Sequence, residues 1–310
     1  MAQIALIGAA SGWGAGFRHA EDGPLALHEL GLARWLAERG LDAQWRAMLR
    51  AETSWRDHPE ITGAATFDLV LRHAKALADE VAAAATAGQF PVVLGGDHSI
   101  AMGTWTGVAR AQARRPLGLV WLDAHLDAHT IETTPSMNAH GMGAAALLGH
   151  GHAPFVALAS GVLKPQHLCY IGARSWEAGE MALLRRLGVR IIAMDEVKQR
   201  GMDWALREAA SIALRGTAGF GISIDLDGFD PMDAPGVGLK EPEGFRAQPT
   251  LAALARLARH PRLRALEIVE YIPEFDQRRR TAHLVRDLIA ALLAPEAALA
   301  DTAAMAGRHR

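Results

Sequence analysis

Seven short apolar runs alternate with Ala- and Leu-rich amphipathic stretches along this chain of 310 residues. The runs are residues 4–7, 91–94, 117–122, 167–171, 189–193, 219–224 and 263–269. Strands that are apolar along their whole length are buried on both faces, which is typical of a parallel sheet. The stretches predict helices that include residues 24–38, 67–87, 177–186, 204–214 and 280–293. We therefore predict a single domain over residues 1–310, a three-layer α/β/α sandwich around a mostly parallel, doubly wound sheet.

The composition excludes several classes of protein. Hydrophobic residues make up 50% of the chain and charged residues 21%, and the formal net charge of −2 favours neither nucleic acid nor an anionic membrane as a partner. The single cysteine, Cys169, rules out an intrachain disulfide framework and is typical of a reducing compartment. The apolar start lacks a basic leader, and no apolar run approaches the roughly 20 residues of a spanning helix. We expect a cytoplasmic protein without nucleic acid or membrane partners.

Three polar clusters come directly after three of the apolar runs. They are Gly95-Gly96-Asp97-His98-Ser99, Asp123-Ala124-His125-Leu126-Asp127 and Ser223-Ile224-Asp225-Leu226-Asp227-Gly228-Phe229-Asp230-Pro231. In a doubly wound sheet, ligands bind beyond the carboxyl ends of the strands, and parallel strands bring those ends to one edge. We therefore predict that the three clusters form one site.

The clusters supply two imidazoles and four carboxylates that are candidate metal ligands. These are His98, Asp123, His125, Asp127, Asp225 and Asp227. Within the second and third clusters the candidates are two residues apart, so an extended backbone turns their side chains to the same side. Nitrogen and oxygen ligands without thiolates suit hard or borderline divalent cations rather than structural zinc. Six ligands are too many for one tetrahedral ion but suit two larger coordination shells about 3.5–4 Å apart.

Two divalent cations at such a site would serve a hydrolase. The pKa of a bound water can fall from about 15.7 to about 7, which makes hydroxide at neutral pH. Four carboxylates roughly cancel the charge of two divalent ions, and hydroxide then leaves a slightly anionic site that suits a cationic substrate. The alternative is structural, since an isolated Asp after a strand commonly caps a turn and an isolated buried His is commonly hydrogen-bonded. Six such residues at strand ends favour the two-metal hydrolase.

At these residues the sequence resembles the ureohydrolase superfamily, which includes arginase, agmatinase and formimidoylglutamase. The likeness extends from Leu6-Ile7-Gly8 through Glu21-Asp22-Gly23-Pro24 to the region around Glu270. It implies two Mn²⁺ ions per subunit, with Fe²⁺ or Co²⁺ as alternatives. One ion would be held by His98, Asp123, Asp127 and Asp225. The other would be held by Asp123, His125, Asp225 and Asp227, so that Asp123 and Asp225 bridge the two.

The same resemblance assigns roles to residues around the ions. Asp97 and Asp230 would orient ligands, with turn capping as the alternative for Asp230. In Ser136-Met137-Asn138-Ala139-His140-Gly141, His140 would transfer protons, because an imidazole titrates near operating pH; the alternative is a histidine that merely contacts the substrate. Glu270 ends a strand and would hold the guanidinium, with Glu267 as the weaker candidate. The implied reaction is attack of a metal-bridging hydroxide on the guanidinium carbon, which yields urea and an amine.

The far end of the substrate would be recognised in the segment after Asp127. Ser136 and Asn138 match positions that contact an α-carboxylate in arginases, and hydroxyl and amide donors suit that group; loop capping is the alternative. Agmatine has no carboxylate, so these residues favour L-arginine. His129 stands where arginases usually carry Asn, and Glu177 is the one acid kept in the segment that binds the α-ammonium. The cavity rim at residues 239–244 also departs from the family pattern.

We predict a hydrolase that acts on a small cationic guanidino substrate and converts L-arginine to L-ornithine and urea. Agmatinase, N-hydroxyarginine amidinohydrolase and formimidoylglutamase or another guanidino-acid hydrolase are the near alternatives. A single-zinc deacylase and a non-catalytic metal-binding protein are the alternatives from other classes. The two-metal ligand set argues against the first, and His140 with Glu270 argues against the second. The resemblance suggests a homotrimer or homohexamer, with residues 278–280 or the Ala-rich C-terminal tail at subunit contacts.

Overall fold

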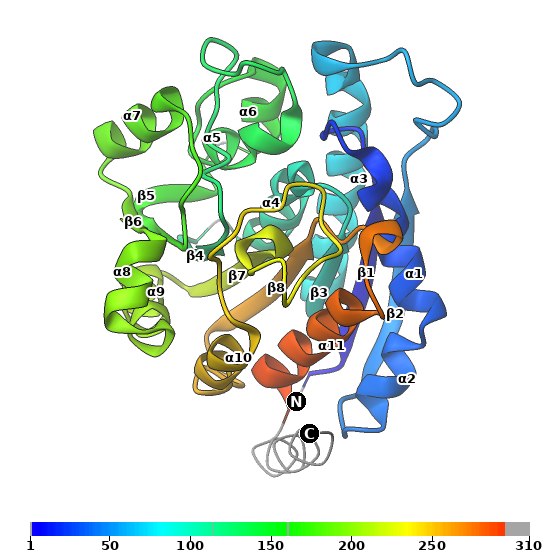
Figure 1. The fold of residues 1–310 in the computed structure, drawn as a ribbon, viewed down its shortest axis with the longest axis vertical. Coiled ribbons are helices and arrows are strands. Elements are labelled where there is room, and N and C mark those ends of the chain that lie inside the picture. The colour runs from blue at the N-terminus through cyan, green and yellow to red at the C-terminus, as the bar shows by residue number, and fades with distance from the viewer. Residues whose placement is uncertain (1, 114, 160, 295–310) are drawn as a thin grey trace.

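A computed structural model describes residues 2–113, 115–159 and 161–294 of the chain (Figure 1). At its centre is an eight-stranded sheet in the order β2-β1-β3-β8-β7-β4-β5-β6. The strands are β1 (Ile4–Ala10), β2 (Ala43–Arg50), β3 (Phe90–Gly95), β4 (Leu117–Leu122), β5 (Leu163–Ile171), β6 (Arg190–Ile192), β7 (Gly219–Asp225) and β8 (Leu263–Val269). Every pair of neighbours is parallel, so the predicted fold class is confirmed and the sheet is parallel throughout rather than mostly.

Helices cover both faces of the sheet and complete the three layers (Figure 1). One face is covered by α1 (Gly23–Glu29), α2 (Leu32–Ala37), α8 (Met194–Arg200), α9 (Met202–Leu214), α10 (Ala247–Ala255) and α11 (Arg280–Leu293). The other face is covered by α3 (Phe67–Thr86), α4 (Ala101–Ala111), α5 (Gly143–Leu147), α6 (Ala153–Ala159) and α7 (Ala178–Leu187). This arrangement follows from the parallel pairing, because each crossover between parallel strands must return along one face of the sheet.

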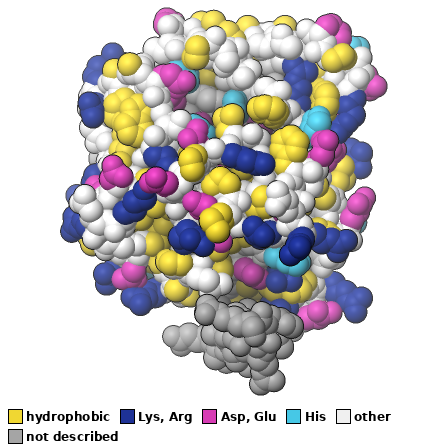
Figure 2. Space-filling view, viewed as in Figure 1, with side chains coloured by type: hydrophobic (Ala, Val, Ile, Leu, Met, Phe, Trp, Pro, Cys, Tyr) yellow, Lys and Arg dark blue, Asp and Glu magenta, His cyan; other side chains and the backbone are white. Residues whose placement is uncertain are grey.

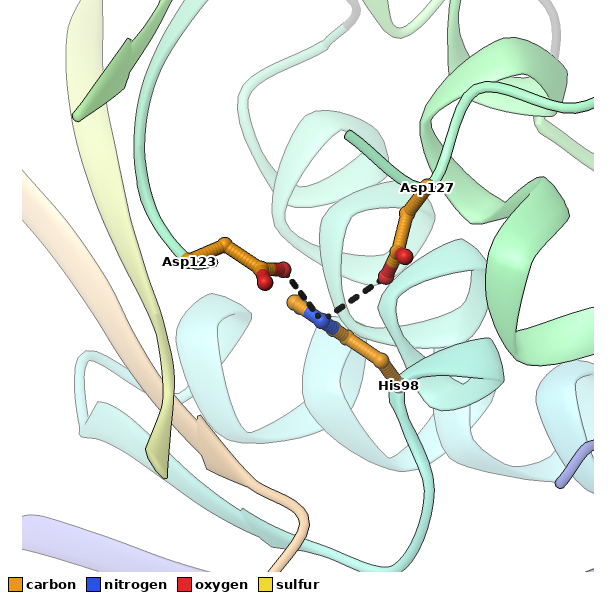
Figure 3. A group of neighbouring side chains, drawn as sticks. All are labelled: His98, Asp123 and Asp127. Carbon is orange, nitrogen blue, oxygen red and sulfur yellow. Dashed lines mark ion pairs between the residues drawn. The ribbon is translucent and has the colours of Figure 1, made fainter. Parts of the chain in front are cut away.

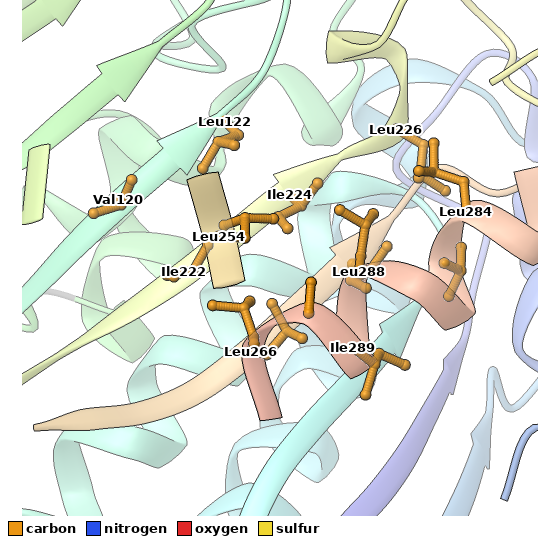
Figure 4. Packing of buried hydrophobic residues seen from close by; sticks show 14 of the residues in the cluster. Val120, Leu122, Ile222, Ile224, Leu226, Leu254, Leu266, Leu284, Leu288 and Ile289 are labelled. Atoms are coloured by element: carbon orange, nitrogen blue, oxygen red, sulfur yellow. The ribbon is translucent and has the colours of Figure 1, made fainter. Parts of the chain in front are cut away.

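Two hydrophobic cores form because alternate residues of each strand point to opposite faces. In β1, Ile4 and Leu6 pack into the core on the α11 side, whereas Ile7 packs into the core on the α3 side. Figure 4 shows the first core, where Ile224 of β7 and Leu288 of α11 lie among other buried aliphatic side chains. Full burial of one such side chain stabilises the fold by about 1.5–3 kcal/mol. The packed strands therefore hold their carboxyl ends at fixed positions.

Two parts of the N-terminal region differ from the prediction. The sequence did not predict β2. This strand lies at the edge of the sheet, and its apolar run is interrupted by the exposed side chains of Gln44, Arg46 and Arg50. The helix predicted over residues 24–38 is two helices, α1 and α2. Gly31 separates them with a φ of 76°, a left-handed conformation that glycine adopts without strain.

The helices, the surface charge and the C-terminal region bear on the predicted membrane, nucleic-acid and subunit contacts. No helix in the described residues is both long and apolar enough to cross a membrane. On the face shown in Figure 2, basic and acidic side chains are interspersed. Residues 295–310, which include the tail considered for subunit contacts, lie outside the described residues. Arg278 and Arg279, from the other candidate contact, have left-handed φ angles of 57° and 58° just before α11.

Candidate metal centre

The site lies where four neighbouring strands end. In the sheet, β3, β8, β7 and β4 are adjacent, and their carboxyl ends meet at one edge. The side chains arise at these ends: His98 begins a short 3₁₀ helix after β3, Asp123 follows β4, Asp225 is the last residue of β7 and Glu270 follows β8. Polar groups from distant parts of the sequence are thus brought together, as the three clusters predicted.

His98 is the centre of the first group of candidate ligands (Figure 3). Its side chain is fully buried, and Nδ1 lies 3.0 Å from Oδ2 of Asp127, 3.0 Å from Oδ2 of Asp225 and 3.2 Å from Oδ2 of Asp123. Among the described residues, Nδ1 has no hydrogen-bond partner. Three carboxylate oxygens that converge on an unpartnered ring nitrogen have the geometry of ligands around a cation rather than that of a hydrogen-bonded pair.

His125 is the centre of the second group. Its Nδ1 lies 3.1 Å from Oδ2 of Asp227 and 3.6 Å from Oδ1 of Asp123. Oδ1 of Asp227 is buried and has no hydrogen-bond partner in the described part of the chain. Asp123 thus turns one oxygen to each imidazole, which is the position that a bridging ligand would take. Its carboxylate is held there by Nε1 of Trp121 at 2.8 Å and by the backbone N–H of His125 at 2.7 Å.

The donor set fits two divalent cations. In each group, ligand atoms from one imidazole and two carboxylates lie within 4.8 Å of one another. The carboxylates crowd one another: burial raises the pKa of Asp225, and the neighbouring Asp227 and Asp123 raise it further. Burial lowers the pKa of His98, but the surrounding carboxylates reverse this effect and raise the pKa well above its usual value. A bound cation would offset this crowding, and its binding would compete with protons for the same ligand atoms.

The other side of the His98 ring is supported by side chains of β7, β8 and α4. Nε2 of His98 lies 2.9 Å from Oγ of Ser223, and this hydroxyl donates to Oε1 of Glu267 at 2.7 Å. Nε1 of Trp105 donates to the same oxygen at 3.1 Å. Because the hydroxyl proton goes to Glu267, Oγ accepts the proton of Nε2, and a cation bound among the carboxylates would take the lone pair of Nδ1. Glu267, the weaker candidate for holding the guanidinium, is fully buried and does not line the cavity.

A cavity of about 380 Å³ opens beside the candidate ligands, and His140 and Glu270 stand in its wall. Oε1 of Glu270 accepts a hydrogen bond from the backbone N–H of His98 at 2.9 Å and lies 3.4 Å from Nδ1 of His140. Burial lowers the pKa of His140, but Glu270, Asp127 and Asp97 together outweigh burial and raise the pKa to about 9. Glu270 and Asp127 both have a left-handed backbone, with φ angles of 67° and 48°. That conformation costs a non-glycine residue on the order of 1–3 kcal/mol and is concentrated at functional sites.

The remaining predicted substrate contacts also line this cavity. They are His129, Ser136, Asn138 and Glu177. Nε2 of His129 lies 3.0 Å from Oε2 of Glu177, so these two residues form a pair. Glu177 is also the N-cap of α7, where its side chain takes part in a capping box. The backbone N–H of Asn138 donates to Oγ of Ser136 at 3.2 Å, so Ser136 caps its own loop as well as lining the cavity.

Asp97 and Asp230 contact loop backbone rather than the candidate ligands' side chains. Asp97 caps the short helix that carries His98, because its Oδ1 accepts from the backbone N–H of Ser99 at 2.9 Å. Both oxygens of Asp230 accept backbone N–H groups, including that of Glu243 at 3.1 Å. Asp230 therefore has the turn-capping contacts that were the alternative to a role in orienting ligands.

Two acids that line the cavity, Glu180 and Glu241, are absent from the predicted site residues. Oε1 of Glu180 accepts from the backbone N–H of Ala128 at 3.1 Å, and Oε2 lies 3.4 Å from Nε2 of His129. Burial raises the pKa of Glu180 to about 8. Its place three residues after Glu177 is the spacing of a capping box, and this signal was available in the sequence. Glu241 has no comparable signal, because it reaches the site through the path of a loop.

The fold and the ligand set together define a metal-dependent hydrolase built on a parallel α/β/α sandwich. A profile of the Arginase family matches residues 2–294. The chain is 37% identical to an arginase of Bacillus caldovelox over 301 residues, which cover 94% of this chain and 98% of that protein. It is similar to the crystal structure of arginase from Bacillus cereus, with a TM-score of 0.86, 34% identity and coverage of 96% of this chain and 99% of the other. The chain belongs to the arginase family.

A more distant structural relative is the arginase of Entamoeba histolytica, solved in complex with L-ornithine. The TM-score is 0.85 at 26% identity, with 94% of this chain and 99% of the other covered. The predicted likeness to ureohydrolases, and to arginases in particular, is confirmed, as is the prediction of a hydrolase. The family implies a binuclear metal site, in agreement with the two groups around His98 and His125.

Proposed function

We propose that this protein hydrolyses L-arginine to L-ornithine and urea at a centre of two Mn²⁺ ions. Support comes from relatives named arginase that match nearly the whole chain, and from a relative whose structure contains L-ornithine. The observation that carries the proposal is the place of Glu270. Its buried carboxylate stands in the cavity wall and is tied to the backbone of the candidate ligand His98. A carboxylate at that point is suited to pair with a guanidinium beside the metal centre.

The two ligand groups would divide between the two ions. His98, Asp123, Asp127 and Asp225 would hold one ion, and Asp123, His125, Asp225 and Asp227 would hold the other. Bound divalent cations would supply hydroxide at neutral pH and stabilise negative charge that develops on the substrate. Fe²⁺ and Co²⁺ suit the same nitrogen and oxygen donors, so they are the alternatives to Mn²⁺.

Glu270 and His140 would act on the reacting end of the substrate. Glu270 would hold the guanidinium by charge-assisted hydrogen bonds and so orient its carbon. The backbone N–H of His98 fixes Oε1 of Glu270, which sets the direction from which the carboxylate meets the substrate. His140 would give a proton to the leaving amine. With a pKa of about 9 beside Glu270 it holds a proton at neutral pH, and nearby cations would lower that pKa towards the operating range.

The other end of the cavity would recognise an amino acid. Ser136, Asn138 and His129 offer hydroxyl, amide and imidazole donors for an α-carboxylate. Glu177 would accept from the α-ammonium, although in this structure it pairs with His129. A substrate without the carboxylate would make none of these charge-assisted hydrogen bonds, which lowers its binding energy.

We further propose that the chain forms a single catalytic domain and acts in the cytoplasm as a homotrimer or homohexamer. One sheet carries all of the candidate ligands, which supports a single domain. The single cysteine supports a reducing compartment. The oligomer rests on the family resemblance.

Urea release after loading with Mn²⁺ tests the choice of substrate. The values of kcat/KM for L-arginine, agmatine, N-hydroxyarginine and 4-guanidinobutyrate would be compared, together with formamide release from N-formimidoylglutamate. We expect L-arginine to exceed agmatine by about 10-fold or more, because one hydrogen bond to a charged group contributes about 1.5–3 kcal/mol. A higher value for agmatine would show that the far end of the cavity does not select a carboxylate.

A further inference from the structure

The rim of the cavity includes a loop, residues 239–244, that is fastened to the metal-ligand segment by one guanidinium. Arg174 donates to the backbone carbonyl of Glu241 at 2.8 Å and to that of Pro242 at 3.1 Å, both in the rim loop. The same side chain donates to the carbonyl of Asp227 at 2.9 Å and to that of Gly228 at 3.2 Å. Because all of these acceptors are backbone groups, Arg174 sets the path of the rim loop relative to the backbone of a candidate metal ligand.

This path brings the side chain of Glu241 to His125. Oε1 of Glu241 lies 3.6 Å from Nε2 of His125, and the Glu241 side chain is 31% exposed. The opposite nitrogen of the ring, Nδ1, is the atom that faces Asp227 and Asp123. Among the described residues, Glu241 is the only acid within 4 Å of Nε2. The two sides of the imidazole are thus divided between the metal centre and the rim loop.

A carboxylate at this place has a definite effect on a metal-binding histidine. Its charge favours the tautomer with the proton on Nε2, which leaves the lone pair on Nδ1 and makes Nδ1 more basic. At 3.6 Å the contact is electrostatic rather than a hydrogen bond. The ring of His98 is supported in the same sense by Glu267, through the hydroxyl of Ser223. Each candidate imidazole ligand therefore has an outer carboxylate, one reached through a hydroxyl and the other provided by the rim loop.

Building on the two-cation centre of the proposed function, we propose that Glu241 is a positioning residue that orients His125 and strengthens the cation site that His125 completes. It acts through His125 and does not itself touch the cation or the reacting atoms. With Glu241 in this role, the rim loop of the substrate cavity contributes to one of the two cation sites, and Arg174 holds the loop in the position that this contribution needs.

The test measures Mn²⁺ binding to the full-length, metal-depleted protein. Calorimetry gives the dissociation constants, and electron paramagnetic resonance gives the concentration of free Mn²⁺. The wild type is expected to bind two ions. In E241Q, which keeps the shape of the side chain, one dissociation constant should rise by about 10–100-fold, the usual cost of losing the outer partner of a ligand, while the other stays unchanged. E241A should give the same loss at the same site. E243Q is the matched control, because Glu243 lies in the same loop but is exposed and pairs with Lys198.

The proposal is wrong if both dissociation constants of E241Q equal those of the wild type. It is also wrong if E243Q shows the same loss of affinity, because the effect would then belong to the loop as a whole. A third contrary result is an E241Q protein that binds Mn²⁺ normally and has only a raised KM for L-arginine, which would make Glu241 a substrate contact. The measurement of binding uses no substrate. A protein that binds two ions with this dependence on Glu241 but releases no urea from L-arginine would refute the proposed function and leave the role of Glu241 standing.

Discussion

The backbone N–H of His98 donates a hydrogen bond to Oε1 of Glu270 at 2.9 Å, although 172 residues separate the two in the sequence. This bond ties a candidate metal ligand to the carboxylate proposed to hold the substrate. The same oxygen lies 3.4 Å from Nδ1 of His140. The candidate metal ligand, the group proposed to hold the substrate and the group proposed to transfer protons thus meet at this one oxygen atom. Substitutions here should separate their roles.

Replacing Glu270 by Gln should impair substrate binding and turnover while leaving the metal centre loaded. The amide keeps the size of the side chain but removes the charge that would pair with a guanidinium. Loss of one partner of a buried charge pair costs about 2–5 kcal/mol, so kcat/KM for L-arginine should fall by roughly 30-fold or more. Steady-state kinetics, with metal content measured by mass spectrometry, would check this. Normal hydrolysis by E270Q would mean that the guanidinium is held elsewhere.

Replacing His140 by Asn should lower kcat without removing metal. General acid–base catalysis contributes about 100- to 10,000-fold, and an amide has no proton to transfer near neutral pH. We expect kcat to fall within that range and two ions per subunit to remain. If kcat in H140N stays within a few-fold of the wild type, His140 contacts the substrate without transferring a proton.

Replacing Asp225 by Ala should remove metal and activity together. Asp225 lies at the end of β7 with one oxygen 3.0 Å from Nδ1 of His98, and the proposed centre uses it for both ions. We expect fewer than two bound Mn²⁺ after dialysis and no measurable urea release. The two-metal proposal would be refuted by full turnover in a metal-depleted D225A protein. D195A is a suitable control, because Asp195 is an exposed acid on α8 that lies outside the site.

His73 should make the protein sensitive to acid for a reason unrelated to the metal centre. Burial on α3 lowers the pKa of its imidazole to about 4, from an ordinary value of 6.5. The unfolded chain therefore binds a proton between pH 6.5 and 4 that the folded protein does not bind, so stability is present above pH 6.5 and is lost as the pH falls towards 4. Near pH 4.5 the loss should be about 2–3 kcal/mol, at about 1.4 kcal/mol per pKa unit.

Urea unfolding of the metal-depleted protein at pH 6.5 and 4.5 would measure this effect, with H73Q as the reference. Other titrating groups are shared by the two proteins and cancel in the comparison. The wild type should lose about 2–3 kcal/mol more than H73Q over this interval. Parallel losses would show that His73 accepts a proton in the folded state.

The part of the site that could be predicted is its place at the strand ends: Asp123 follows an apolar strand, and a parallel sheet brings His98 and Asp225 to the same edge. The extended backbone expected within the clusters is wrong, because Asp127 has a left-handed φ of 48° and Asp227 lies in a 3₁₀ helix, Leu226–Gly228. The strand β2 escaped prediction because an edge strand needs only one buried face, so its pattern is broken by exposed polar side chains.

Glu241 escaped prediction for a different reason. Its contact with His125 depends on where the rim loop travels, and that path is set by hydrogen bonds from Arg174 to backbone carbonyls. Backbone acceptors are present at every residue, so they leave no mark in the sequence. The pairing of His129 with Glu177 is similar, because each residue was assigned to the substrate and the structure joins them to each other.

The place of β8 in the sheet has a consequence for how the enzyme is made. It is the last strand in the described residues, yet it lies between β3 and β7 and so joins the strand that leads to His98 to the strands that lead to Asp225 and Asp123. During synthesis the two halves of the sheet cannot meet until β8 has left the ribosome, because long-range parallel pairing waits for its last partner. The donors of the first group, His98 from one half of the sheet and Asp123, Asp127 and Asp225 from the other, therefore come together only when β8 is in place. The second group does not wait for β8, because its residues follow the adjacent strands β4 and β7.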